Sequence, residues 1–185
     1  MNFPAHIFKA YDIRGLVEGE LSEELAYGVG RAFVEVLKKR GIELNKKKLI
    51  VGRDMRPTSL ILAQQVIQAI CDEGSDVVDI GMTTTPVFNF TCAENLEYAG
   101  GIMVTASHNP AEYNGFKLTM SDGLPIGKET GMDDIRDTIE VGNFSEGVVQ
   151  KGSVVERDVR EAYITKLFSL VDPLNIKPLK VVIDG

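Results

Sequence analysis

The sequence has few of the residues that build disulfide-rich or metal-dependent folds. It contains only two cysteines, Cys71 and Cys92, and two histidines among 185 residues, and no Cys-x-x-Cys or Cys/His spacing typical of a zinc site occurs. Both cysteines lie in segments with helical periodicity, which predicts buried thiols rather than a disulfide. A chain of this length buries roughly 70% of its unfolded surface, so it needs neither a disulfide nor a structural metal to fold.

Positive charge and long apolar runs are also scarce. Twenty basic residues against 27 acidic ones give a net charge of -7, and the dense basic face that holds nucleic-acid phosphates is not recognisable. No run approaches the roughly 18 apolar residues that span a bilayer, and the first nine residues lack the pattern of a secretion signal. We therefore expect no nucleic-acid partner, no membrane association and a cytoplasmic location.

Two nucleotide-binding fingerprints are missing as well. The glycines Gly28 and Gly30 lie inside an amphipathic helical pattern rather than after a strand, which excludes a dinucleotide-binding turn, and no Walker A sequence occurs. A phosphate site must depend on a few local cations, because charges beyond the Debye length of about 8 Å are screened at physiological salt.

Helical and strand patterns alternate through the first 150 residues. Helices are expected at residues 22–40, 58–73, 85–94 and 127–141, and strands at 48–52, 76–81, 98–104 and 116–120. This alternation is typical of an α/β domain. The expected fold is a three-layer α/β/α domain with a mixed, largely parallel four-stranded sheet.

The pattern begins again at about residue 155. A helix expected at 157–171 leads through Pro173 and Pro178 to the apolar segment 179–183, which has the composition of a buried strand but is followed by nothing that would cover it. We expect a first domain at 1–150. Residues 151–185 are expected to form a linker, a helix and the first strand of a truncated second α/β domain.

The loop Thr105–Pro110 is the first candidate for chemistry. It follows the expected strand 98–104, at the end of the sheet where open α/β folds bind ligands. Pro110 keeps the preceding residue out of helical angles, so the chain turns sharply and can present the Ser107 hydroxyl. A plain polar turn is the alternative. A serine hydrolase fits poorly, because the glycines of a nucleophile elbow are absent and the side chain of the adjacent His108 points away from Ser107 in an extended loop.

Two further cations, Lys117 and Arg14, suit a phosphate ligand. Residues 113–117 are expected to form a turn at Asn114-Gly115 and then a strand that returns Lys117 toward the serine loop, with a solvated strand lysine as the alternative. Arg14 presents a guanidinium fork that matches phosphate oxygens, but it can equally form a surface salt bridge with Asp12.

A third basic segment, Gly52–Thr58, lies where a strand passes into a helix. Backbone N–H groups at such a junction bind anions, and Arg53 and Arg56 can reinforce them. The alternative is that Asp54 only caps the helix or pairs with these arginines.

Taken together, three segments resemble the α-D-phosphohexomutase family: Tyr11–Gly15, Gly52–Arg56 and Thr105–Pro110 continuing to Lys117. The residues Tyr113–Lys117 are most similar to the phosphomannomutase/phosphoglucomutase branch, whereas phosphoglucosamine mutases typically have Asp-Asn-Gly-Ile-Lys there. The resemblance covers the whole chain and includes every catalytic position found in this part of the family.

The resemblance implies a site and its cofactors. Ser107 is expected to be the phosphoserine, and its phosphate oxygen is expected to be a ligand of Mg²⁺, with the remaining ligands outside this chain. Arg14, His108 and Lys117 match the family's catalytic positions, and Tyr11, Arg14 and Lys117 its substrate-binding ones. The expected partners are hexose phosphates and the C-terminal domains of the same enzyme, with hexose 1,6-bisphosphate as activator and intermediate.

The implied function is interconversion of hexose 1-phosphate and hexose 6-phosphate through a phosphoserine enzyme. The chain alone is expected to be inactive, because most substrate contacts lie on the absent domains. Two alternatives remain: a phosphoglucosamine mutase, and a non-catalytic module that binds phosphosugars.

Overall fold

A computed structural model describes residues 3–142, 144, 150–172 and 176–183. The helices are η1 (Ala5–Ile7), α1 (Glu23–Lys39), α2 (Ser59–Asp72), α3 (Thr85–Glu94), η2 (Lys128–Thr130), α4 (Met132–Val141) and α5 (Arg160–Leu170). The strands are β1 (Ile13–Leu16), β2 (Lys48–Arg53), β3 (Val77–Met82), β4 (Tyr98–Val104), β5 (Tyr113–Met120) and β6 (Val154–Glu156).

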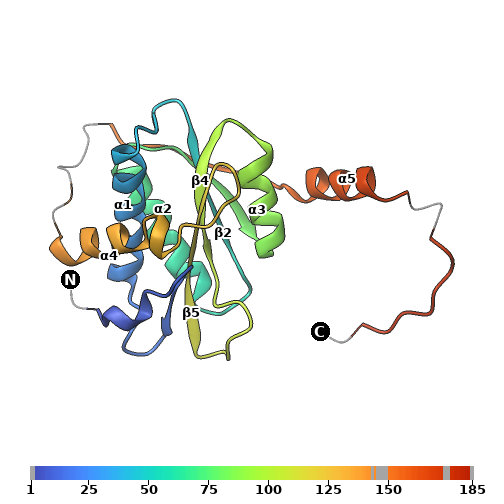
Figure 1. The fold of residues 1–185 in the computed structure, drawn as a ribbon, viewed down its shortest axis with the longest axis horizontal. Coiled ribbons are helices and arrows are strands. Elements are labelled where there is room, and N and C mark those ends of the chain that lie inside the picture. Colours follow the sequence, from blue (N-terminus) through green and yellow to red (C-terminus); the bar gives the residue numbers. More distant parts are fainter. Residues whose placement is uncertain (1–2, 143, 145–149, 173–175, 184–185) are drawn as a thin grey trace.

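These strands form one mixed sheet in the order β1-β5-β4-β2-β3-β6. The neighbours β4, β2, β3 and β6 run parallel, whereas β5 is antiparallel to both β4 and β1. Helices α1, α2 and α4 lie on one side of the sheet and α3 on the other (Figure 1). The predicted three-layer α/β/α fold with a largely parallel sheet is therefore confirmed.

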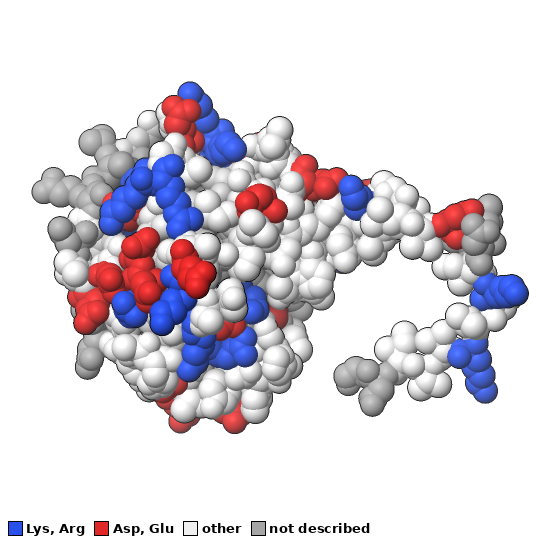
Figure 2. All heavy atoms as spheres, in the orientation of Figure 1, with Lys and Arg blue, Asp and Glu red and all other residues white. Residues whose placement is uncertain are grey.

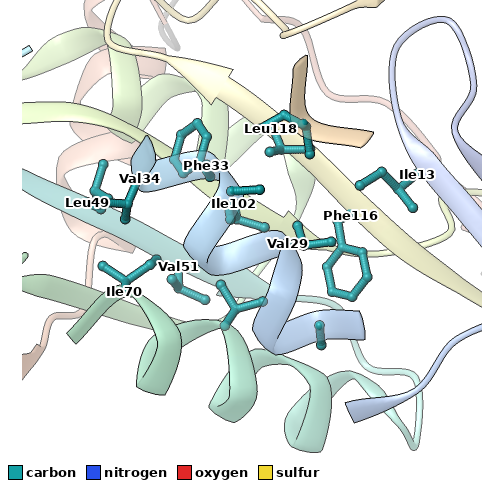
Figure 3. Close-up of a cluster of buried hydrophobic side chains, with 14 of the residues drawn as sticks. Ile13, Val29, Phe33, Val34, Leu49, Val51, Ile70, Ile102, Phe116 and Leu118 are labelled. Atoms are coloured by element: carbon teal, nitrogen blue, oxygen red, sulfur yellow. The ribbon is translucent and has the colours of Figure 1, made fainter. Parts of the chain in front are cut away.

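The larger core lies between the sheet and the layer of α1, α2 and α4. Figure 3 shows Val29 and Phe33 of α1 packed toward the strand residues Ile102, Phe116 and Leu118, and all five are fully buried. Burial of each such side chain stabilises the fold by roughly 1.5–3 kcal/mol. The apolar stripe that the periodicity predicts for α1 therefore faces the sheet.

Helix α1 begins directly after Ser22, the residue predicted to cap it. The Ser22 hydroxyl accepts a hydrogen bond of 3.0 Å from the backbone N–H of Leu25, which satisfies one of the donors left open at a helix start.

A second, smaller core on the opposite face of the sheet holds Phe88 and Cys92 of α3 against Ile50 and Val78 of the sheet. Both faces of β2 are therefore covered, as a central parallel strand requires.

The sheet has six strands rather than the four expected. The two strands that were not predicted, β1 and β6, are short and lie at the edges of the sheet. Strand β1 has four residues and β6 has three, and all three residues of β6 are exposed. Neither is long enough to show a clear alternating pattern. β6 lies beyond residue 150, in the segment expected to be a linker, and pairs with β3. The division at 150/151 stays a prediction.

The helix expected at 127–141 is interrupted. Gly131 has φ +119°, which breaks the segment into the short η2 and the α-helix α4. Such an angle lies outside the helical region and is open mainly to glycine.

The turn expected at Asn114-Gly115 was a wrong prediction. Both residues lie within β5, where Asn114 pairs with Gly15 and Gly115 with Arg14. The buried Asn114 amide donates to the hydroxyls of Thr58 and Ser59 at 2.9 and 3.0 Å. The Asn-Gly pair therefore serves packing between strand and helix, and the chain reverses earlier, at the serine loop.

The segment 179–183, expected to be the first strand of a truncated second domain, has no regular structure here, and its large apolar side chains are exposed. Its place as a strand in a second domain stays a prediction. A strand needs a neighbouring strand to satisfy its backbone groups, and the segment has none. Figure 1 shows α5 projecting from the body of the domain and the tail beyond it lying apart from the sheet. In the described part of the chain, no helix is long and apolar enough to cross a membrane.

Cys92 provides a test of core burial. Both cysteines are free and buried, as predicted, and burial raises the pKa of the Cys92 thiol to about 12. The unfolded thiol ionises near pH 9, so between pH 9 and 12 only the unfolded state loses the proton. The free energy of unfolding is therefore expected to fall with rising pH by about 1.4 kcal/mol per unit from this group.

The measurement is the pH dependence of urea unfolding of the wild type relative to Cys92→Ala. The variant is expected to lose this part of the alkaline slope, and native Cys92 is expected to resist thiol reagents at pH 8. Equal slopes for the two proteins, together with rapid labelling of Cys92, would show that the thiol is accessible.

Candidate functional site

The Ser107 loop projects from the C-terminal end of β4. Ser107 is exposed, and among the described residues it is the one non-glycine residue with a positive φ, of 55°. Its backbone N–H donates to the Thr105 hydroxyl at 2.8 Å, and the Asn109 N–H donates to the Ala106 carbonyl at 3.1 Å. A left-handed serine costs roughly 1–2 kcal/mol, so the surrounding contacts hold the loop in a strained shape.

The Ser107 side chain faces open space. It lines a hollow of about 400 Å³ at the C-terminal ends of β2, β3 and β4, with the remaining lining from Asp54, Met55, Met82, Thr83, Thr84, Thr85, Met103 and Thr105. This is the end of the sheet at which ligands bind in open α/β folds. The position predicted for the serine is therefore observed, and a ligand can reach its hydroxyl.

Arg14 and Lys117 meet at one carboxylate. The Lys117 ammonium lies 3.1 Å from Asp12 Oδ2, and the Arg14 guanidinium donates to the same oxygen. The three side chains are largely buried, with 11, 18 and 26% exposure for Asp12, Arg14 and Lys117. The structure thus brings together two predicted cations from different strands and confirms the Asp12–Arg14 pair, which is buried rather than a surface bridge.

Asn109 links this cluster to the serine loop. Arg14 Nη1 donates to Asn109 Oδ1 at 2.8 Å, two residues from Ser107. Among the buried side-chain atoms that the structure describes, Arg14 Nε has no hydrogen-bond partner. Arg14 and Asn109 also line a second hollow of about 310 Å³, together with His6, Lys9, Leu16, Glu20 and Tyr113. A fixed guanidinium whose buried Nε–H has no hydrogen-bond partner therefore lies on one side of the loop.

The other two predicted site residues are less confined. Tyr11 is 67% exposed, and its ring lies over Gly127, where an added Cβ would come within 2.8 Å of the ring carbon Cδ1. His108 is exposed on the loop beside Ser107. Both side chains are accessible to a ligand, but neither is held in the cluster formed by Asp12, Arg14 and Lys117.

Arg56 does not form the anion site suggested by its place after a strand. Its guanidinium donates to Asp54 and to backbone carbonyls of the serine loop. The sequence did not predict that Arg56 would bind the backbone of the serine loop. Its only relevant signal was an arginine close to the end of a strand. Asp54 pairs with Arg56, as the capping and pairing alternative proposed.

Charges of both signs are interspersed on the face of the molecule seen in Figure 2. Attraction for an anion therefore depends on local cations such as Arg14 and Lys117. Within the described ranges, no three His, Cys, Asp or Glu side chains are grouped so that they could hold a metal ion. A metal at this site would need ligands besides these side chains.

Comparisons with known proteins agree on one family. A family model described as phosphoglucomutase/phosphomannomutase, alpha/beta/alpha domain I, matches residues 5–146. The phosphomannomutase of Escherichia coli (strain K12) is 39% identical over 179 residues, which are 96% of this chain and 38% of that protein. The phosphohexose mutases of Xanthomonas campestris pv. campestris are 38% identical over all 185 residues, which cover 39% of their length.

The fold comparison gives the same answer. The crystal structure of a phosphoglucomutase/phosphomannomutase family protein from Burkholderia thailandensis matches with a TM-score of 0.80 and 31% identity, over 91% of this chain and 36% of that one. The chain therefore spans less than two fifths of the length of the relatives it matches.

Proposed function

The chain belongs to the phosphoglucomutase/phosphomannomutase family, and from this premise we propose that it is the domain that carries the phosphoryl group of a phosphohexomutase, on Ser107. The proposed enzyme interconverts hexose 1-phosphate and hexose 6-phosphate through a bisphosphate intermediate. The supporting observation is the exposed, left-handed Ser107, on a loop that Arg14 contacts through Asn109.

In this proposal Arg14 and Lys117 stabilise the transferring phosphoryl group. At an effective dielectric constant of 20, a cation about 4 Å from a phosphate oxygen contributes on the order of 4 kcal/mol. Asp12 offsets one of the two positive charges but fixes both cations before substrate arrives. Preorganised charge of this kind is the main protein contribution to phosphoryl transfer. Tyr11, exposed at the rim, is proposed to contact the sugar.

The proposed step exchanges one P–O bond for another. A sugar hydroxyl attacks the phosphorus of phospho-Ser107, the bond from phosphorus to the serine oxygen breaks, and the hexose bisphosphate forms. The hydroxyl proton is accepted by a base and the serine oxygen gains a proton. His108 and Lys117 are the candidates for these transfers. Reorientation of the bisphosphate and return of its other phosphoryl group to Ser107 complete the cycle.

A divalent cation has a partial site in this chain. We propose that an oxygen of phospho-Ser107 is one ligand of Mg²⁺ and that the other ligands come from outside these residues. When bound, the ion would neutralise charge on the phosphoryl group. Hexose 1,6-bisphosphate is the proposed activator, because it can phosphorylate Ser107 directly.

The relatives are more than twice as long as this chain, which supports a division of substrate binding and catalysis between several domains. We propose that further domains of the same enzyme bind the distal sugar and phosphate groups, with residues 151–185 leading into the first of these, the second domain of the enzyme. Alignment of reactants supplies roughly 7–11 kcal/mol of a barrier. The 185-residue chain alone is therefore expected to show no useful turnover in a coupled mutase assay, and rates near those of a complete enzyme would contradict this division.

The proposed function is tested with the multidomain protein, by which we mean this chain joined to the proposed further domains of the same enzyme. The substrates are the 1-phosphates of mannose, glucose and glucosamine. Conversion of mannose or glucose 1-phosphate to the 6-phosphate is the expected result. Preference for glucosamine phosphate would place the protein in the phosphoglucosamine mutase branch. Binding of hexose phosphate, measured by calorimetry, without turnover or phosphorylation would instead identify a binding module.

A further inference from the structure

All five N–H groups of the Arg56 guanidinium have acceptors around the serine loop. Arg56 follows β2, and its side chain is only 9% exposed. Nε donates to Asp54 Oδ2 at 3.2 Å. The four remaining contacts go to backbone carbonyls: Nη1 to Pro110 at 2.7 Å and Tyr113 at 3.0 Å, and Nη2 to Ser107 at 3.1 Å and Asn109 at 2.6 Å.

The guanidinium is itself fixed from behind. Asp54 Oδ1 accepts the Ser59 hydroxyl at 2.5 Å and the Arg56 backbone N–H at 3.1 Å. The Ser59 oxygen in turn accepts a hydrogen bond of 3.0 Å from the buried Asn114 amide. The Asp54 N–H donates to the Val104 carbonyl at 3.0 Å. Arg56 is therefore connected to α2, β4 and β5 before it reaches the loop.

The conformation of the serine loop depends on the Arg56 guanidinium. Three carbonyl groups of the loop, those of Ser107, Asn109 and Pro110, accept hydrogen bonds from this one side chain, as does the carbonyl of Tyr113 at the start of β5. The backbone itself adds only the N–H bonds of Asn109 to Ala106 and of Tyr113 to Pro110. The Ser107 carbonyl, which Arg56 holds, belongs to the residue with the strained φ of 55°. A strained conformation persists only where its surroundings determine it.

We propose that Arg56 is a positioning residue that fixes the direction of the Ser107 hydroxyl through the backbone of the loop. The inference rests on the proposed function of Ser107. The requirement is the planar fork rather than the positive charge, because all five donors are used and none remains for a phosphate. A lysine keeps the charge, but its single ammonium cannot serve the same set of carbonyls.

The first test measures backbone hydrogen exchange in the 185-residue chain. In Arg56→Lys the amides of Asn109 and Tyr113 are expected to exchange at least about tenfold faster than in the wild type, as the loop opens locally. The matched control is Arg40→Lys. Arg40 also donates to a backbone carbonyl, that of Thr130, and this change is expected to leave exchange in the serine loop unaltered.

The second test measures turnover in the multidomain protein. Arg56→Lys is expected to lower kcat by about 10²-fold with little change in KM, because a misplacement of about 1 Å costs that much. Guanidinium ion added to Arg56→Ala is expected to restore part of kcat. An unchanged rate of loop exchange, an unchanged kcat, or a rise in KM alone would overturn the proposal.

Two controls keep the outcome clear. If Arg56→Lys does not fold, Asp54→Asn provides the second variant, because it weakens the support of the guanidinium; the same loop amides must then exchange faster at unchanged thermal stability. If the wild-type enzyme never carries phosphate on Ser107, the proposed function fails, while the exchange result still decides whether Arg56 holds the loop.

Discussion

Ser107→Ala is expected to abolish phosphoryl uptake and mutase turnover in the multidomain protein. The hydroxyl is the proposed acceptor, and alanine has no oxygen that can carry the group. Loss of a nucleophile costs at least about 10⁴-fold in rate. The measurements are intact mass after incubation with a hexose 1,6-bisphosphate, and the rate of 1-phosphate to 6-phosphate conversion.

Ser169→Ala is the matched control. Ser169 is exposed on α5 and its hydroxyl contacts the Lys166 carbonyl, far along the chain from the serine loop. This variant is expected to gain phosphate and turn over substrate as the wild type does. A phosphorylated mass in Ser107→Ala equal to that of the wild type would refute the assignment of the acceptor.

Gly115→Ala is expected to destabilise the domain by about 3 kcal/mol or more. A Cβ at this position would lie 2.0 Å from the Ile13 carbonyl oxygen, and a backbone atom of a paired strand cannot move away without breaking the pairing of β1 with β5. Overpacking of this kind costs 1–3 kcal/mol and sometimes more. Since β1 carries Arg14, opposite Gly115, the change also displaces a proposed catalytic side chain.

Urea unfolding gives the measurement, with Gly41→Ala as the comparison. Gly41 has φ +75° and no atom within 4 Å of a built Cβ, so alanine there is expected to cost only the backbone strain of about 1–2 kcal/mol. Equal losses at the two positions would mean that β1 and β5 are less closely packed than the structure shows.

The regular part of the fold was predictable because its signals are local. The N-cap Ser22, the apolar stripe of α1 and the seven apolar or small residues of β4 are each visible in a short window of sequence. The edge strands β1 and β6 were not predictable, since their pairing depends on neighbours distant in the chain. The same reason explains the missed strand character of Asn114-Gly115, whose turn chemistry is overridden by buried contacts with α2.

The candidate site, like the fold, was predictable only where its signals are local. The loop that carries Ser107 was predictable from the position of a polar segment after a buried strand, whereas the role of Ser107 was inferred from the family resemblance. Arg14 and Lys117 were identifiable as cations, but nothing local shows that both contact Asp12. Arg56 was assigned to the wrong kind of contact, because its acceptors are backbone carbonyls about 50 residues away, and backbone groups leave no trace in the sequence.

The most direct test of the central claim is phosphopeptide mapping of the multidomain protein after brief incubation with a hexose 1,6-bisphosphate. We expect one added phosphoryl group, on the peptide that contains Ser107. When the phosphoryl groups of the bisphosphate carry an isotopic label, excess unlabelled hexose 1-phosphate is expected to remove the label from this peptide, because the acceptor takes the labelled group and later turnovers return an unlabelled one. Phosphate on another residue, or none while turnover continues, would contradict the account.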